Sequence, residues 1–291
     1  MKASKNNLVK DYYYLVKPGI IRGNLLTAVA GFLLAAQHQI AVGRLLVTLL
    51  GLALIIAAAC VSNNILDRHL DKKMARTAKR PLVNGRISVR AASVYALVLL
   101  TSGSLLLGAK VNLLALSFAL SGYVAYVAVY GYYKRHSTLG TAVGSISGAV
   151  PPVVGYVAVS NRIDAAAIIL FLILVCWQMP HFFAIAIYRL KDYTSAGLPV
   201  LPVKKGLTTT KIQCLIYILG YGIASLTLSF AGYTGIIYAI TMSLVCLLWL
   251  ALAVQGFQTK NTETWARKLF FFSLATITVQ CILIGSNSLI I

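Results

Sequence analysis

The stretch "LLVTLLGLALIIAAACVSNNILDRHLDKKMARTAKRPL", residues 45–82, changes character near its middle. Residues 45–66 carry no charged side chain and are long enough, as a helix, to cross about 30 Å of hydrocarbon. The remainder holds two acids, Asp67 and Asp71, among several lysines and arginines. This stretch therefore predicts a membrane-spanning helix that ends in a polar segment containing both signs of charge.

The rest of the chain contains further long runs without charged side chains. Hydrophobic residues make up 59% of the sequence and charged residues 11%, and the mean hydropathy is +0.83, which is too apolar for a soluble domain. The uncharged runs are 23–43, 45–66, 91–109, 111–133, 137–161, 165–188 and 269–291, and 212–259 is long enough for two spans. We expect an all-α polytopic membrane protein in which residues 1–291 form one domain, a bundle of nine transmembrane helices.

The basic residues predict how this bundle lies in the membrane. With the N-terminus in the cytoplasm, the cytoplasmic connections hold 23 of the 26 lysines and arginines, and the opposite side holds only Arg44, Lys110 and Arg162. This asymmetry follows the positive-inside rule. The net charge of +20 is thus a topology signal and does not indicate a nucleic-acid partner. The C-terminus is expected on the outer side, and anionic membrane lipid is a secondary partner for the basic loops.

Asp67, Asp71 and Asp192 all fall on the predicted cytoplasmic side, near the ends of the second and sixth spans. Asp67 and Asp71 are four residues apart and so share a helix face, and Asn63 stands one turn earlier on that face. Asp192 follows the sixth span as the first two acids follow the second. One interpretation is a solvated junction in which these acids pair with nearby Lys and Arg. The other is a site at which both acidic segments meet.

The second interpretation draws on an apparent internal repeat. The span count fits a four-helix unit used twice plus one helix, and such repeats often place a site between their halves. Carboxylates beside an excess of cations suit a diphosphate bridged by Mg²⁺, which takes carboxylate and phosphate oxygens together. The acids Asp67, Asp71 and Asp192 would hold the metal. The basic candidates for the diphosphate are Arg76, Lys79, Arg80, Lys134, Arg135 and Lys191, although positive-inside bias alone would also place basic residues there.

Four segments resemble the UbiA-type intramembrane prenyltransferases: "KPGIIRGNLLT" (17–27), 63–82, "YYKRHSTLGTAVGSISGAVPPVVGY" (132–156) and "WQMPHFFAIAIYRLKDYTSAGLPVLPV" (177–203). The "KRHS", "GAVPP" and "PHF" segments resemble the members that farnesylate haem. The resemblance implies a nine-helix bundle with a central cavity. It also implies transfer of a farnesyl group from farnesyl diphosphate to a vinyl group of haem B, with addition of water, giving haem O and diphosphate.

The resemblance also implies roles for single residues. Asn63, Asp67 and Asp71 would form the first Mg²⁺–diphosphate motif and Asp192 would belong to the second, where many members carry two acids and this chain has one. His181 and His136 are candidates for contact with haem, because imidazole suits iron, and each has a structural or solvated alternative. The implied setting is the bacterial inner membrane, with a terminal haem–copper oxidase assembly as a potential partner.

Other functions remain open from the residues. A related prenyltransferase acting on an aromatic acid or quinone precursor would share the metal chemistry. A transporter is the non-enzyme alternative, but it would place ionisable groups near the bilayer midplane. Two structural expectations accompany these functions: Pro151 and Pro152 should break the fifth span, and tyrosines at 123–133 could stabilise an allylic cation or serve as an interfacial aromatic belt.

Overall fold

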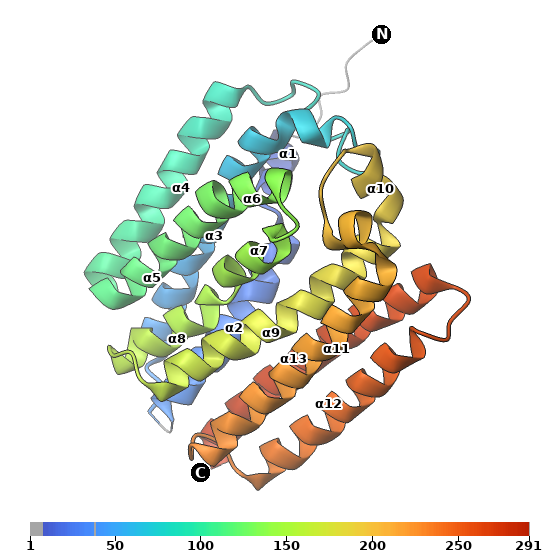
Figure 1. Ribbon diagram of the computed structural model, residues 1–291. Coiled ribbons are helices and arrows are strands. Elements are labelled where there is room, and N and C mark those ends of the chain that lie inside the picture. Colours follow the sequence, from blue (N-terminus) through green and yellow to red (C-terminus); the bar gives the residue numbers. More distant parts are fainter. Residues whose placement is uncertain (1–7, 38, 291) are drawn as a thin grey trace.

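The computed structural model describes residues 8–37 and 39–290, and every regular element in these ranges is a helix (Figure 1). Lys2 and Lys5, counted above for orientation, and Ile291, at the end of the ninth predicted span, lie outside the described residues. In chain order the elements are α1 (Leu8–Leu15), α2 (Pro18–Ala36), α3 (Val42–Asp71), α4 (Val89–Lys110), α5 (Leu113–Val124), the π-helix η1 (Ala125–Tyr130), α6 (Gly131–His136), α7 (Gly140–Gly148), α8 (Val150–Ser160), α9 (Ala165–Tyr188), α10 (Leu190–Ser195), α11 (Leu201–Phe230), α12 (Ile236–Gln255) and α13 (Thr262–Ile290).

The nine predicted spans are confirmed. The described chain contains nine helices, or continuous helical segments, long and apolar enough to cross a membrane. The first begins at Pro18 and ends at Ala36, several residues before the predicted ends, because proline suits the first turn of a helix and the chain turns at Gln37, whose φ is +46°. The second continues through Asp71. Both acids of the first motif are therefore on helical backbone.

The fifth span is broken where the prolines predicted. Its two halves, α7 and α8, meet at Ala149, and Pro151 and Pro152 lie in the first turn of α8, where a missing backbone N–H is tolerated. Gly148, the last residue of α7, lies against Gln178 of α9: a Cβ atom there would come within 2.2 Å of the Gln178 Oε1 atom. The break thus lets α7 approach α9 closely.

Two glycines allow the centre of the bundle to close. Helices α2 and α8 pack together, and a Cβ on Gly155 would lie 1.9 Å from the carbonyl oxygen of Ala28, while one on Gly31 would lie 2.0 Å from that of Pro152. Around this contact α3 packs on α4, and α9 on α11 and α13. Leucines and isoleucines on the outer faces stay exposed, for example Leu247 at 61%, as expected of surface that contacts lipid.

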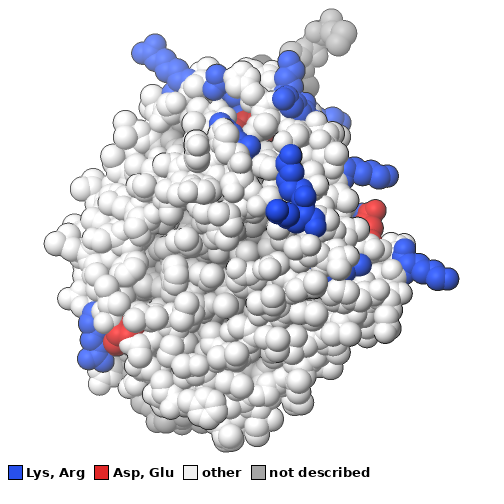
Figure 2. Space-filling view, viewed as in Figure 1, with Lys and Arg blue, Asp and Glu red and all other residues white. Residues whose placement is uncertain are grey.

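Charged side chains gather at one end of the bundle. Figure 2 shows most of the visible lysines and arginines at the end where α3, α6 and α10 meet the loops, with a broad uncharged surface below them and one small group at the opposite end. This gathering at one end agrees with the asymmetry of basic charge in the sequence, while the orientation of the bundle in a membrane stays a prediction. The division of the bundle into two four-helix units stays a prediction.

Candidate functional site

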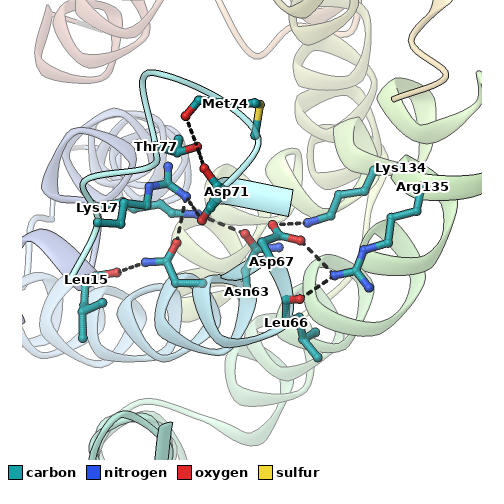
Figure 3. A network of polar contacts seen from close by, with 12 residues as sticks. Leu15, Lys17, Asn63, Leu66, Asp67, Asp71, Met74, Thr77, Lys134 and Arg135 are labelled. Carbon is teal, nitrogen blue, oxygen red and sulfur yellow. Dashed lines mark hydrogen bonds and ion pairs between the residues drawn. The ribbon is translucent and has the colours of Figure 1, made fainter. Parts of the chain in front are cut away.

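The last two turns of α3 carry three oxygen-bearing side chains on one face. Asn63 and Asp71 are 2% and 3% exposed, and the Asp67 side chain is 13% exposed. All three lie within the polar network of Figure 3. Because polar groups in such surroundings need partners, the contacts of each side chain define the chemistry of the site.

Two cations from the distant helix α6 bind Asp67. Lys134 Nζ forms a short ion pair with Asp67 Oδ2, and Arg135 Nη2 donates to Asp67 Oδ1 at 3.0 Å and to the Leu66 carbonyl at 2.8 Å. The Lys134 side chain is 12% exposed, so this pair is largely withdrawn from water. Lys134 and Arg135 therefore lie at the first acidic motif, as the sequence suggested, but in contact with its carboxylate.

Asp71 has a partner from the loop after α3. Arg80 Nη1 donates to Asp71 Oδ2 at 2.6 Å and to Asn64 Oδ1 at 3.3 Å. Thr77 Oγ1 donates to the Asp71 carbonyl at 2.8 Å and so satisfies an open carbonyl at the helix end. Of the candidate cations in this loop, Arg80 reaches the acids, whereas the side chains of Arg76 and Lys79 are exposed.

Lys17 is a residue of this site that the sequence analysis missed. Its Nζ donates to Asn63 Oδ1 at 3.0 Å, and its backbone is left-handed, with φ +53°, where the chain turns into α2. Burial, with smaller contributions from Arg80 and Lys134, lowers the pKa of Lys17 to about 8, so the ammonium form still dominates at pH 7. The signal was present as the "KPG" at the start of the first quoted motif.

The donor set of this cluster fits a metal–diphosphate ligand. Four cations (Lys17, Arg80, Lys134 and Arg135) surround the two carboxylates, which leaves an excess of positive charge that suits a polyanion. The Nδ2 atom of Asn63 is buried and has no partner among the described residues. No group of three or more His, Cys, Asp or Glu in those residues could hold a metal alone. Mg²⁺ needs only one or two carboxylates when phosphate supplies further oxygens, so the pair suffices.

The second acidic segment lies close to this cluster without joining it. Asp192, in α10, is 3.8 Å from Arg189 as an ion pair, and its side chain is 29% exposed. Burial raises the pKa of the neighbouring Tyr193, while the charge of Arg76, from the loop after α3, lowers it. The two loops are therefore neighbours. The Lys191 side chain is exposed.

The two histidine candidates differ in environment. His136 is exposed at the end of α6, where its Nδ1 is 2.8 Å from the Tyr132 carbonyl and its ring stacks on Tyr132. His181 is 9% exposed within α9, and its Nδ1 is 2.7 Å from Ser273 Oγ of α13. Neither contacts the acidic cluster directly in the hydrogen bonds of the described residues.

Aromatic rings approach the cluster from η1. Tyr126 and Tyr130 stack with ring centroids 5.5 Å apart, and Lys134 Nζ lies 5.1 Å from the Tyr130 ring centroid. A π-helical stretch within an α-helix is frequently found at functional sites. The Tyr130 ring thus lies next to the group that binds Asp67.

A nine-helix membrane bundle with paired carboxylates and surplus cations at one end defines an intramembrane prenyltransferase. The chain belongs to the UbiA prenyltransferase family, whose family model matches residues 24–275. It is 48% identical over 284 residues to a protein of Pectobacterium atrosepticum named protoheme IX farnesyltransferase, covering 97% of this chain and 96% of that protein.

Solved structures of the same family share the fold. The chain is similar to a digeranylgeranylglyceryl phosphate synthase structure, with a TM-score of 0.81 and 19% identity, over 97% of this chain and 99% of that one. It is also similar to a UbiA homolog from Archaeoglobus fulgidus bound to GPP and Mg²⁺, with a TM-score of 0.67 and 17% identity, over 95% and 99% of the two chains. At these identities the likeness establishes the fold.

Proposed function

We propose that this chain transfers the farnesyl group of farnesyl diphosphate to a vinyl group of haem B, with addition of water, to give haem O and diphosphate. The observation that carries this proposal is the cluster of two carboxylates and four cations at the end of α3. The acceptor is taken from the relative named protoheme IX farnesyltransferase, which is similar over nearly the whole chain.

The first acidic motif would hold Mg²⁺ against the diphosphate. Asp67 and Asp71 supply carboxylate oxygens and Asn63 an amide oxygen from one helix face, which is the hard oxygen donor set that Mg²⁺ prefers. When bound, Mg²⁺ supplies charge stabilisation to the departing diphosphate. The UbiA homolog from Archaeoglobus fulgidus that was solved with GPP and Mg²⁺ supports the use of this metal with a prenyl diphosphate.

The cations of the cluster would exchange partners when the donor binds. In the structure Lys134, Arg135 and Arg80 neutralise the acids. With a metal held by the carboxylates, these side chains and Lys17 would be free to donate to phosphate oxygens by charge-assisted hydrogen bonds. The ion pairs would thus neutralise the buried acids between turnovers, and their cations would contact phosphate when the donor binds.

The second loop would close over the same ligand. Asp192 would complete the metal shell from α10, and Arg76, Lys79 and Lys191 would offset the outer phosphate charge. The proximity of Arg76 to Tyr193 supports this closure, because it brings the loop after α3 beside α10. Asp192 itself has only a long contact with Arg189, so little must be broken to move it.

The covalent step would break the allylic C–O bond, and its electron pair would leave with the diphosphate. The vinyl π electrons of haem B then form the new C–C bond to the farnesyl cation, and water adds to the resulting cation with release of a proton. Aromatic faces stabilise cations, and the ring of Tyr130, which lies beside Lys134, would stabilise the allylic cation.

The asymmetry of basic charge supports a cytoplasmic site. With the N-terminus inside, the cluster at the end of α3 would face the cytoplasm. The diphosphate of farnesyl diphosphate would bind at this end, and the apolar farnesyl chain would enter the bundle. A bacterial inner membrane and delivery of the product to a terminal haem–copper oxidase assembly complete the proposal.

The test is direct. Purified protein is incubated with haem B, farnesyl diphosphate and Mg²⁺, and the extracted haem is analysed by mass. We expect haem O, and no product when EDTA removes the metal. Farnesylation of an aromatic acid with haem B unchanged would show that the acceptor is wrong and that a related prenyltransferase activity is right.

A further inference from the structure

His181 lies in a polar arrangement that links α9 to α13 and that the donor site does not use. The residue is 9% exposed, and Ser273, its partner on α13, is 0% exposed. His181 Nδ1 lies 2.7 Å from Ser273 Oγ, and Ser273 Oγ in turn lies 2.6 Å from the Phe270 carbonyl. A buried imidazole within a membrane span usually has a functional reason.

One tautomer of His181 satisfies both of these contacts at once. In it the Ser273 hydroxyl donates its single hydrogen to the Phe270 carbonyl, which can only accept. The Ser273 oxygen then accepts from His181, which places the ring hydrogen on Nδ1. The neutral imidazole then keeps its lone pair on Nε2, and the described residues offer Nε2 no hydrogen-bond partner.

Aromatic neighbours fix the plane of the ring. Trp177 stacks on His181 with centroids 4.8 Å apart at 24°, and its indole nitrogen donates to the Ser273 carbonyl at 2.8 Å. Phe270 lies 4.8 Å from the imidazole at 35°, and Phe182 meets it edge-on at 5.3 Å. Ser273 thus anchors both His181 and Trp177, so the direction of the Nε2 lone pair is defined before any ligand arrives.

An oriented, unpartnered imidazole nitrogen among flat apolar rings matches the requirements of a haem ligand. Metal-ligating histidines typically donate their other ring N–H to a fixed acceptor, which sets the tautomer, and haem iron is commonly held by one histidine. We propose that His181 Nε2 is the axial ligand of the haem iron in the acceptor complex and that Ser273 is its positioning residue. This inference rests on the proposed function, which makes haem B the acceptor.

The test reads iron ligation separately from turnover. Ferric haem B is titrated into the purified full-length protein without farnesyl diphosphate, and its ligation is followed by electron paramagnetic resonance and resonance Raman. We expect a histidine signature in the wild type. His181→Ala should lose this signature, and added imidazole should restore it. Ser273→Ala should weaken haem binding about 10- to 100-fold and alter the spectrum, while Ser273→Thr, which keeps the hydroxyl, should resemble the wild type.

A matched control is Ser225→Ala, another buried serine, on α11, which forms no hydrogen bond to His181 or Ser273. A histidine signature that persists in His181→Ala, or a Ser273→Ala variant that behaves like Ser225→Ala, overturns the inference. Normal ligation in His181→Ala with a farnesylated product that lacks the hydroxyl would assign His181 to water addition instead. Imidazole rescue decides the question if Ser273→Ala fails to fold. Wild-type protein that ligates haem but forms no haem O contradicts the proposed function and leaves the ligation intact.

Discussion

Replacing Asp67 with asparagine tests the donor site most sharply. The change keeps the shape of the side chain but removes the charge that Lys134 and Arg135 neutralise in the free protein and that would bind Mg²⁺ in the complex. Both effects come from the same carboxylate, so the loss of unfolding free energy and the loss of turnover must be measured separately.

The expected loss of stability is bounded by the contacts. Hydrogen bonds to charged groups contribute about 1.5–3 kcal/mol. The asparagine oxygen can still accept one hydrogen bond, so we expect the variant to lose up to about 3 kcal/mol of unfolding free energy. The activity loss should be larger than that instability explains. Without metal binding, transfer should fall about 100-fold or more, which corresponds to about 2.7 kcal/mol of barrier.

The assay is haem O formation per folded protein, measured beside thermal unfolding. Asp164→Asn is the matched control, because Asp164 also binds an arginine (Arg162), accepts from Tyr156, and caps α9 at the opposite end of the bundle. It should cost stability and leave turnover per folded molecule unchanged. If Asp67→Asn turns over as Asp164→Asn does, Asp67 is only an ion-pair partner and the metal site is elsewhere.

Three further outcomes are expected. Lys17→Met should raise the Kd for farnesyl diphosphate about 10-fold or more, measured by calorimetry, because a phosphate contact is lost. Its unfolding temperature should change little, because removing a buried ammonium offsets the hydrogen bond that Asn63 Oδ1 loses. An unchanged Kd would refute the assignment. Gly155→Ala should lose about 3 kcal/mol of stability in thermal unfolding, since its Cβ would lie 1.9 Å from a backbone carbonyl, whereas Gly43→Ala, with nothing within 4 Å, should not. A reporter active only outside the cytoplasm should be active when fused after Ile291 and inactive after Lys191; the reverse pattern would overturn the orientation.

The number of spans could be predicted because it depends on run length alone. Each uncharged stretch long enough to cross hydrocarbon became a membrane-length helical segment. The residues at which the helices begin and end were harder to predict, because they depend on backbone turns such as the one at Gln37. The break before Pro151 was predictable, because proline removes a donor that the helix interior requires.

The site was predictable within one helix and not between helices. The four-residue spacing was sufficient to place Asp67 and Asp71 on one face. Their partners depend on which spans become neighbours, and Lys134 is 67 positions away from Asp67. The place of Lys17 depends on its left-handed backbone, where the chain turns into α2 and the side chain reaches Asn63. Hydrophobic periodicity does not predict such a turn. The resemblance to the UbiA family supplied the reaction.

The π-helical stretch Ala125–Tyr130 determines the direction in which the side chains of α6 point around the helix axis. One surplus residue in an α-helix rotates all later side chains by about 100° about the helix axis. Lys134 and Arg135 come shortly after this stretch and contact Asp67 on the neighbouring helix α3. A chain one residue shorter here would form a regular helix and turn both cations away from the acid. At this position, therefore, the number of residues constrains the site more tightly than their identity, and insertions or deletions should be tolerated less than substitutions.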